Sequence, residues 1–388
     1  MTDVKQRLDI RVLTSMTDCR ADLWDGLFDS QYPFTQHRFL SLLERSGSAC
    51  AATGWQPCHL LLGDEARPFG AMPLYLKGHS WGEYVFDWTW AEAYQRQGLP
   101  YYPKLLTAIP FTPAIGPRLA LDSEESLSGT APALLEAIHQ LADRQGASSW
   151  HLLFSDAALV QALEVAGGIL RSTVQYLWFN RDYRDFEDFL DALASRKRKG
   201  IRRERKELRN QGLSVRRLCN REIDADWWDF FYRVYHNTYH KHSGNQGYLT
   251  RAFFEELGSV MDGQLMMAVA EKGGEKVAAA LFFYDDDNLY GRYWGCVREY
   301  DYLHFELCYY QGIEFAIASG LKCFDAGAQG EHKVRRGFEP VENRSVHWIR
   351  HMDFALAIKR FVTEEQRYVL DYIEETRRNL PYKSTVDL

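Results

Sequence analysis

The sequence predicts a mixed α/β protein built from two consecutive units of similar plan. Its 388 residues exceed the usual size of a single hydrophobic core, so two domains are expected. Strand-like and helix-like hydrophobic patterns follow one another in the order β-α-α-β-β-β-α-β, and the same order then occurs a second time. A repeated order of elements favours internal duplication of a unit of roughly 190 residues.

In the first unit, the patterns predict three helices and five strands. Phe39, Leu40 and Leu43 share one helical face, and Gly146 has the position of a glycine that ends a helix. The predicted helices are residues 21–28, 36–44 and 132–146, and the predicted strands are residues 8–13, 58–63, 70–77, 83–88 and 149–154.

The second unit repeats this order, and part of the sequence repeats as well. "ADLWD" at 21–25 aligns with "ADWWD" at 225–229. The predicted helices are residues 225–239, 249–257 and 304–320, and the predicted strands are residues 213–218, 264–270, 276–285, 288–295 and 321–327. We therefore expect a first domain at 1–182 and a second at 183–388, which starts with a basic helix at 195–211. The helices at the C-terminus are expected to pack back on the first domain.

Charge is distributed unevenly along the chain. The formal net charge is −7, yet residues 196–209 hold nine Lys or Arg and two Glu. Such a segment is either a solvated connecting helix or a phosphate-binding surface for RNA or a nucleotide. In the second case, Arg202, Arg203 and Arg205 are the expected contacts. An acidic protein with one basic patch is not a general nucleic-acid coat.

Composition and the N-terminus favour a cytoplasmic protein. No apolar run is long enough to span a bilayer, so no membrane insertion is expected. The first 13 residues lack the apolar region of a secretory signal. The seven cysteines are scattered, which is typical of reduced thiols.

Several common catalytic signatures are missing. His236 and His240 have helical spacing for zinc, but Asn237 stands where a zinc protease needs glutamate, so no metal site is expected. Neither a P-loop nor a glycine-rich dinucleotide motif follows any predicted strand.

Two regions combine residue types that can bind or transform a ligand. The segment 81–106 mixes aromatic rings with carboxylates, which suits an amine or sugar acceptor but also an irregular lid packed by its own rings. His304 and Glu306 stand at the start of the predicted helix 304–320, beside a strand end, where α/β folds bind ligands. Either side chain could accept a proton, although a capping or packing role for His304 stays open.

Three stretches resemble the FemAB-like family of peptidoglycan biosynthesis or recognition proteins, in the tandem branch of the GNAT acyltransferase superfamily. They are "AYQRQGLPYYPKLLTAIPFTPAIGPRL" at 93–119, the basic helix, and "FDAGAQGEHKVRRGFEPV" at 324–341. The resemblance covers nearly the whole chain. It implies two GNAT-like acyltransferase units facing a shared cleft and transfer of an acyl or aminoacyl group to an amine. Lys333 matches a substrate-contacting lysine of Fem enzymes, and Gly337-Phe338 matches the pair that follows it.

The resemblance leaves the donor open. GNAT enzymes that use acetyl-CoA carry a glycine-rich phosphate loop, but residues 296–306 contain no glycine, and only Gln95-x-x-Gly98 survives in the first unit. Acyl-CoA is our first choice of donor and aminoacyl-tRNA the second, with no tightly bound cofactor. The acceptor is expected to be a small or peptide-like amine.

We therefore predict an N-acyltransferase with His304, Glu306 and Lys333 as catalytic residues. A glycan- or nucleotide-sugar-binding protein without catalysis is the alternative of another class. The expected substrate-binding residues, with the first unit on the acceptor side, are Asp87, Trp90, Glu92, Tyr94, Arg96, Arg118, Tyr293, Asp325 and Arg335.

Overall fold

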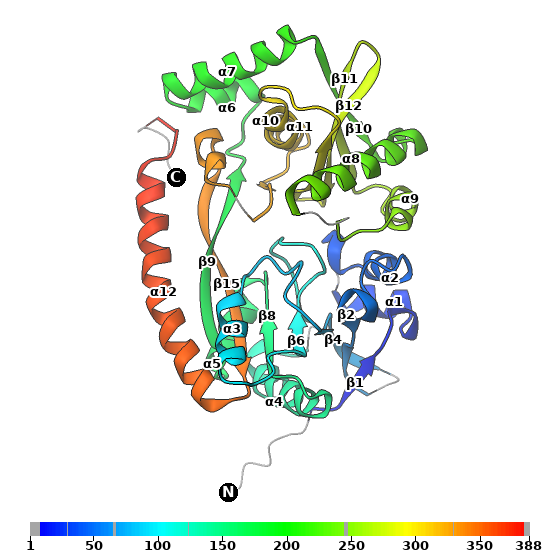
Figure 1. The fold of residues 1–388 in the computed structure, drawn as a ribbon, viewed down its shortest axis with the longest axis vertical. Helices are drawn as coiled ribbons and strands as arrows, with labels where there is room; N and C mark the ends of the chain where they lie inside the picture. The colour runs from blue at the N-terminus through cyan, green and yellow to red at the C-terminus, as the bar shows by residue number, and fades with distance from the viewer. Residues whose placement is uncertain are drawn as a thin grey trace, which may run out of the picture. The chain divides into compact units, whose positions relative to one another are not determined.

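Two compact units make up the chain in the computed structural model, which describes residues 8–28, 30–64, 67–122, 124–243, 247–328 and 330–383 (Figure 1). The first unit is Met1–Thr173 with Glu342–Leu370, and the second is Val174–Val341 with Asp371–Leu388. Each unit thus combines two stretches of chain, whereas the prediction divided the chain once, at 182/183. The strands β9 (Ile169–Phe179) and β15 (Glu339–Ile349) contribute residues to both units, and a hydrophobic pattern cannot show such a division within a strand.

The first unit contains two groups of strands. One has the antiparallel order β1-β3-β4-β7, and the other runs β2-β5-β6-β8 and continues into β15. β6 and β8 are parallel, and α4 connects them and packs on β8. The strands are β1 (Ile10–Leu13), β2 (Trp55–Pro57), β3 (His59–Gly63), β4 (Pro68–Met72), β5 (Tyr75–Lys77), β6 (Lys104–Thr107), β7 (Ala120–Leu121) and β8 (Ser149–Leu152).

Helices of the first unit begin and end largely where local signals place them. Ser126 caps α4 by accepting a hydrogen bond from the Gly129 amide, so this helix starts five residues before the predicted Pro132. Gly146 ends it with a φ of 65°, as predicted. The helices are α1 (Ala21–Phe28), α2 (His37–Arg45), α3 (Trp88–Arg96), α4 (Leu127–Gln145), α5 (Ala157–Val165) and most of α12 (Met352–Arg378).

Two strand predictions in this unit are wrong. The predicted strand 83–88 does not form, although Glu83, Val85 and Asp87 alternate as buried residues. The two carboxylates instead turn inward to Lys104, and Tyr84 has a φ of 63°, which is not a strand conformation. The predicted strand 70–77 is two strands, β4 and β5, which lie in different sheets on either side of Pro73.

The second unit has one run of strands in the order β10-β11-β12-β13-β14-β9. All neighbouring pairs are antiparallel except β13 with β14. α8 packs on β12 and β13, and α6 lies beside α7 at the edge of this unit (Figure 1). The strands are β10 (Leu213–Cys219), β11 (Leu265–Lys272), β12 (Glu275–Tyr284), β13 (Asn288–Cys296) and β14 (Cys323–Asp325). The helices are α6 (Phe186–Ala192), α7 (Ser195–Asn210), α8 (Ala225–Ser243), α9 (Arg251–Val260), α10 (Leu303–Phe305) and α11 (Gln311–Ala318).

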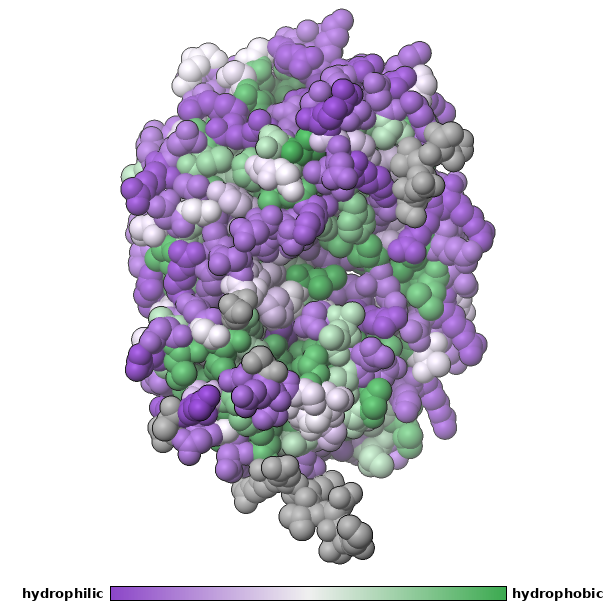
Figure 2. All heavy atoms as spheres, turned by 180° about the vertical axis from the view of Figure 1, so that it is seen from behind, coloured by the Kyte–Doolittle hydropathy of each residue, from purple (hydrophilic) through white to green (hydrophobic). Residues whose placement is uncertain are grey.

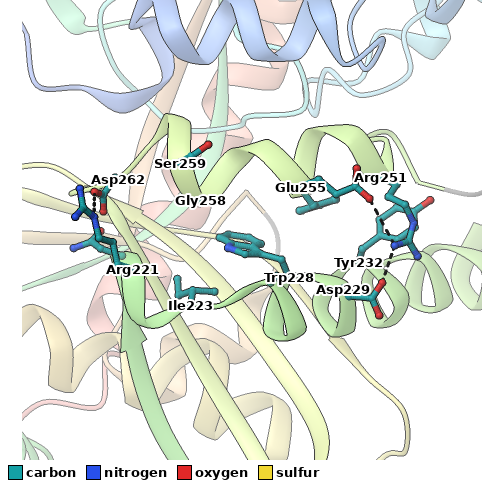
Figure 3. Close-up of a pocket in the computed structure, with 13 residues that line it drawn as sticks. Arg221, Ile223, Trp228, Asp229, Tyr232, Arg251, Glu255, Gly258, Ser259 and Asp262 are labelled. Carbon is teal, nitrogen blue, oxygen red and sulfur yellow. Dashed lines mark hydrogen bonds and ion pairs between the residues drawn. The ribbon is translucent and has the colours of Figure 1, made fainter.

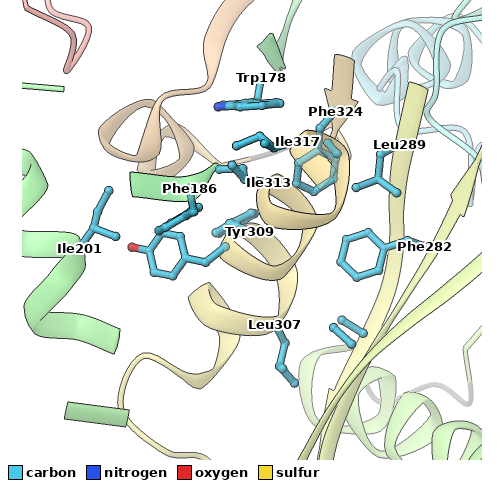
Figure 4. Close-up of a cluster of buried hydrophobic side chains, with 14 of the residues drawn as sticks. Trp178, Phe186, Ile201, Phe282, Leu289, Leu307, Tyr309, Ile313, Ile317 and Phe324 are labelled. Carbon is cyan, nitrogen blue, oxygen red and sulfur yellow. The ribbon is translucent and has the colours of Figure 1, made fainter. Parts of the chain in front are cut away.

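The core of the second unit joins the strands to the helix that follows β13. Phe282 of β12 and Leu289 of β13 pack with Ile313 and Ile317 of α11 (Figure 4). Ile201 of α7 joins the same cluster. Burying an aliphatic or aromatic side chain of this size stabilises a fold by about 1.5–3 kcal/mol, so this contact anchors α7 despite its charge.

The face shown in Figure 2 is mostly hydrophilic, with hydrophobic residues scattered among the hydrophilic ones. Across the described ranges, every helix is either too short or too polar to cross a bilayer.

Candidate active site

The sheet of the second unit forks between β13 and β14. The two parallel strands pair over Asn288–Tyr290 and Cys323–Asp325. Beyond this point, β13 continues to Cys296 while β14 ends. A cavity of about 110 Å³ lies beside the free part of β13, and we call it the fork cavity. The carboxyl ends of parallel strands are where open α/β sheets bind ligands.

Residues of β12, of β13 and of the helix that follows β13, together with Ala326 just after β14, line the fork cavity. β13 carries a bulge there, because Leu281 pairs with Tyr293 whereas Phe282 pairs with Gly291, and Arg292 is the extra residue. Such bulges are common beside active sites, where they change the direction of side chains. The lining residues are Ala280, Leu281, Phe282, Gly291, Arg292, Tyr293, Trp294, His304, Cys308, Tyr309 and Ala326.

The helix that follows β13 is irregular next to the cavity. Tyr302 precedes it with a φ of 65°, and α10 gives way to a π-helical turn at Glu306–Tyr310 before α11 continues. π-helical turns inside α-helices occur mostly at functional sites. This turn carries Cys308 and Tyr309, which both line the cavity.

His304 lies in the wall of the fork cavity. Its ring centroid is 4.9 Å from that of Trp294 and 5.3 Å from that of Tyr309. Burial, and then the positive charge of His332, Arg336 and Lys333, lowers the pKa of His304 to about 4. No hydrogen bond to either ring nitrogen is found among the described residues. His304 is therefore a neutral imidazole whose nitrogens are available to a substrate.

Lys333 and Asp325 place two buried charges next to this cavity. Their exposed fractions are 2% and 5%. The Lys333 ammonium donates to the Gly327 carbonyl oxygen, and the Gly327 amide donates to Asp325 Oδ1 at 2.8 Å. Burial lowers the pKa of Lys333 to about 8, although Asp325 opposes the shift, and burial raises the pKa of Asp325. Lys333 therefore stays a buried cation at neutral pH.

Glu306 does not reach the fork cavity. Its carboxylate accepts two hydrogen bonds from Arg205, at 3.0 and 2.8 Å, and one from Gln311. Arg205 also pairs with Glu314, and Arg202 pairs with Glu187. Two of the three predicted phosphate contacts, Arg202 and Arg205, are thus engaged in ion pairs. The sequence could not predict these pairs, because the acidic partners lie in other segments of the chain.

Four other cations of α7 line a groove on the other side of the irregular helix: Arg196, Lys197, Lys199 and Arg203. This groove has a volume of about 790 Å³, and we call it the α7 groove. Arg335, a predicted binding residue, is exposed in it, whereas Arg336 is buried and bonded to Glu204 at 3.1 Å. The lining residues are Arg196, Lys197, Lys199, Gly200, Ile201, Arg203, Glu204, Phe305, Tyr310, His332, Arg335 and Arg336.

The predicted acceptor wall of the first unit is mostly interior. Trp90 and Tyr94 are 4% and 3% exposed and pack in a cluster with residues of α12. Glu92 and Arg96 form an exposed ion pair one helical turn apart. Arg118 is fully buried and donates to the carbonyl oxygens of Ala114, Pro117 and Leu153. These hydrogen bonds fix its own loop to the end of β8. These side chains do not form one binding wall, because the helical turn of α3 directs Trp90 and Tyr94 into the core.

Asp87 belongs instead to a buried polar network around Lys104. The Lys104 ammonium donates to Ser80, at 2.8 Å, to Glu83, at 2.7 Å, and to Asp87. Tyr101 donates to Asp87 at 2.6 Å. Because these attractions outweigh burial, the pKa of Asp87 is lowered and that of Lys104 is raised. Lys104 was missed because one lysine at the start of a short strand has no sequence signature.

Two buried histidines lie close to this network. His151 of β8 and His347 of β15 face each other across the antiparallel pair, with 2.7 Å between their Nδ1 atoms. Tyr101 links His151 to Asp87 through a 3.3 Å contact. Burial lowers the pKa of His151 to about 3 and that of His347 well below its usual value. Neither residue carried a motif, so sequence reasoning had no signal for them.

A third hollow, of about 620 Å³, lies between α8 and α9 (Figure 3). Trp228 occupies its middle, Arg221 pairs with Asp262 at one end, and Arg251 pairs with Asp229 at the other (Figure 3). Each charge at the two ends therefore already has an oppositely charged partner. His236 and His240 of α8 stack at 6.4 Å, and among the described residues no group of three or more potential ligands is arranged to hold a metal ion.

Comparison with known proteins identifies the fold. The structure matches FemX at 13% identity with a TM-score of 0.52, over 88% of this chain and 98% of that chain. It matches a conserved protein of unknown function from Bacteroides thetaiotaomicron at 12% identity with a TM-score of 0.50, over 87% and 99%. It matches L-PGS from Bacillus licheniformis at 10% identity with a TM-score of 0.49, over 83% and 95%. Among curated proteins, none matches the sequence.

The predicted fold class is confirmed by the match to FemX, which extends over both units. The sequence profile of one family, described as peptidoglycan biosynthesis or recognition, matches residues 15–384. The resemblance seen in three stretches of sequence therefore extends through the whole fold. The chain belongs to the FemAB-like family.

Proposed function

We propose that this protein is an N-acyltransferase whose transfer site is the fork cavity of the second unit. One observation carries the proposal: a neutral histidine with two available nitrogens lines a cavity at a sheet fork, next to a buried lysine. Membership of the FemAB-like family supports a role in peptidoglycan biosynthesis or recognition.

The proposed reaction is direct attack of an amine on an activated carbonyl. The amine nitrogen bonds to the carbonyl carbon of a thioester or ester, and the carbonyl oxygen becomes an oxyanion. His304 accepts the proton that the amine loses, the carbon–sulfur or carbon–oxygen bond breaks, and the leaving group takes up a proton. Holding both reactants together contributes roughly 7–11 kcal/mol, and a general base contributes roughly 10²–10⁴-fold.

Lys333 serves this reaction as a buried cation. An ammonium group placed in a site that excludes water stabilises a developing oxyanion far more than it would in water. The Gly327 carbonyl oxygen accepts a hydrogen bond from the buried Lys333 ammonium, and the Gly327 amide in turn donates to Asp325. Tyr293 lines the same cavity and is proposed to contact the acyl group or the amine.

Acyl-CoA remains the first donor and aminoacyl-tRNA the second. The tRNA alternative is favoured by the α7 groove, whose cations lie on the other side of the helix that carries His304. The acceptor is proposed to be a small or peptide-like amine, in keeping with the family description.

The test is replacement of His304 by Gln. Transfer from an acyl-CoA or a charged tRNA to a panel of amines is followed by mass spectrometry. We expect a loss of roughly 10²–10⁴-fold in rate, because glutamine cannot accept the proton. The matched control is His240→Gln, at an exposed histidine of α8, which should keep full activity.

Two results would count against the proposal. If the His304→Gln protein turns over as fast as the parent, then His304 is not the base. If the parent binds donor or acceptor but no product mass appears, the recognition role, as a glycan- or nucleotide-sugar-binding protein, takes its place.

A further inference from the structure

The α7 groove holds far more positive charge than its surroundings. Six cationic side chains and one carboxylate line it, on a protein whose formal net charge is −7. Arg336 is the cation that pairs with the carboxylate, Glu204. The five others make no ion pair within the described part of the chain: Arg196, Lys197, Lys199, Arg203 and Arg335.

Like charges held this close repel one another unless an anion lies between them. Other cations of α7 do find acidic partners, since Arg198 pairs with Asp191, Arg202 with Glu187 and Arg205 with Glu306. Acidic residues are therefore available around α7, yet the groove is left with one. An unneutralised groove of this kind attracts an anionic ligand.

The arrangement of the cations suits a chain of phosphates better than a single carboxylate. Arg196, Lys199 and Arg203 follow one face of α7 and span about 10 Å along its axis. Gly200 lies among them and leaves the helix backbone uncovered. Arg335 adds a guanidinium from a different segment, and guanidinium groups bind phosphate through two parallel hydrogen bonds.

Aromatic rings stand beside these charges. Phe305 lines the groove with the Arg336 guanidinium 3.4 Å from its ring centroid, and the exposed ring of His332 lies 5.8 Å from Phe305. Rings of this kind stack with nucleobases in proteins that bind single-stranded RNA. The same groove thus offers partners for both parts of a nucleotide.

The groove is linked to the fork cavity through one hydrogen bond. Tyr309 lines the cavity, His332 lines the groove, and the Tyr309 hydroxyl lies 2.7 Å from His332 Nε2. The two hollows therefore flank the same turn of helix.

We propose that the α7 groove binds the phosphate chain of the nucleotide-bearing donor whose acyl group enters the fork cavity. The contacts are Arg196, Lys197, Lys199, Arg203 and Arg335. The identification of the ligand as the donor rests on the proposed transferase function. Phosphate binding to the groove can be measured without turnover. The phosphates come either from a coenzyme A or from the single-stranded end of an RNA.

The experiment compares two double variants of the full chain. Arg203→Ala with Arg335→Ala removes two groove cations. Lys206→Ala with Arg209→Ala removes two exposed cations of α7 that lie outside the groove, so both variants have the same net charge. The probes are coenzyme A, inorganic tripolyphosphate and a labelled single-stranded RNA oligonucleotide, each titrated at several salt concentrations.

We expect the groove variant to bind the probes about tenfold more weakly, and the control variant to bind like the parent. For RNA, loss of two phosphate contacts should make the slope of log affinity against log salt shallower by about 1.4. Groove-dependent binding of coenzyme A identifies a coenzyme donor, and groove-dependent binding of the RNA alone identifies an RNA donor.

Equal weakening in both variants, or no binding of any probe by the parent, would overturn the phosphate site. A failure of the transferase proposal would give a different set of results. In that case the groove variant still loses binding, while the parent forms no product from any donor. The His304→Gln protein serves as a second reference, because it should bind every probe as the parent does.

Discussion

Lys333, Arg335 and Arg336 lie within four residues, and the structure places their side chains in three different surroundings. Lys333 is buried beside Asp325, Arg335 is exposed in the α7 groove, and Arg336 is bonded to Glu204 and Tyr310. In the 3₁₀ turn Glu331–Arg336, three residues complete one turn, so Lys333 and Arg336 both point to the buried side while Arg335 points to solvent. A single basic stretch can therefore supply a buried cation, an exposed cation that lines a groove, and a buried arginine that stabilises the fold through hydrogen bonds.

Lys333→Met is the test of the buried cation. Methionine fills a similar volume without a charge, so we expect the protein to stay folded while the transfer rate falls by roughly 10²–10³-fold. Since the pKa of Lys333 is about 8, the parent should lose activity as the pH rises through that value. Rates between pH 6.5 and 9.5 and thermal melting of both proteins provide the measurement. Unchanged rates with an unchanged pH profile would show that the ammonium takes no part.

At the scale of elements, α7 is held by ion pairs as much as by apolar packing. Arg205 reaches the π-helical turn through Glu306 and reaches α11 through Glu314. Ile201 and Leu208 supply the buried apolar contacts of the same helix. Arg205 is thus part of the fold, whereas Arg202 lies on the exposed side with Glu187.

Replacing these two arginines separately should change stability by very different amounts. Arg205→Ala leaves the buried Glu306 carboxylate without its cation, so we expect the free energy of unfolding to fall by about 3 kcal/mol. Arg202→Ala removes an exposed pair, and its effect should stay below about 1 kcal/mol. Urea denaturation monitored by tryptophan fluorescence measures both. Equal effects would mean that the pair with Glu306 does not hold α7.

The pairing of β8 with β15 carries a pH dependence. His151 and His347 are neutral in the folded protein at pH values where both are charged in the unfolded chain. Their folded pKa values are lowered, so the unfolded state binds more protons between about pH 3 and 6.5. The stability that the pair contributes is therefore present above pH 6.5 and is lost as the pH falls.

We expect the free energy of unfolding to decrease by up to about 2.7 kcal/mol per pH unit from these two groups between pH 6 and 4. His347→Gln removes one of them and should halve that slope. Urea denaturation at pH 6.5, 5.5 and 4.5 measures the slopes, with His240→Gln on the surface of α8 as the control. A slope that is the same in all three proteins would contradict a neutral buried pair.

At the scale of the whole molecule, each unit is built from two stretches that are far apart in sequence. The segment Asp371–Leu388 belongs to the second unit, and Tyr382 is its buried anchor. Its hydroxyl donates to the Gly337 carbonyl oxygen at 2.6 Å, and its backbone bridges to Leu193 at the end of α6. The C-terminal segment thus closes the unit that contains the candidate active site.

Tyr382→Ala should loosen this closure. We expect a loss of about 3 kcal/mol, the lower end for truncation of a buried aromatic side chain. Hydrogen exchange measured by mass spectrometry should become faster in α6 and in residues 331–338, the segments that Tyr382 contacts. Exchange in the β3–β4 pair of the first unit is the internal reference. Unchanged exchange in α6 would contradict the proposed anchoring.

Much of the element order could be predicted, because it depends on local patterns. Hydrophobic periodicity located α2, α8, α9 and β11–β13, and Gly146 and Gly320 mark helix ends with φ values of 65° and 69°. The family could also be identified from three stretches, and its profile matches residues 15–384. Short strands such as β6, with four residues between irregular segments, lack enough pattern to be detected.

The candidate site was predicted only in part. The structure brings Tyr293 and His304 to one cavity, with Lys333 and Asp325 beside it, but their roles stay predictions. Glu306, Arg205 and Asp87 looked equally suitable in sequence. Each is paired with an oppositely charged side chain that lies 17 or 101 residues away in the sequence, and spacing along the chain does not reveal such contacts.

The sequence by itself determined the α/β class, the family and the short list of groups that can carry chemistry. These follow from interactions between residues close in the chain, or from stretches long enough to resemble relatives. Only the tertiary structure decided which charges are neutralised in the interior and which are left at the α7 groove and the fork cavity. That outcome depends on pairs of side chains far apart in sequence, whose desolvation and Coulomb energies exist only once the chain has folded.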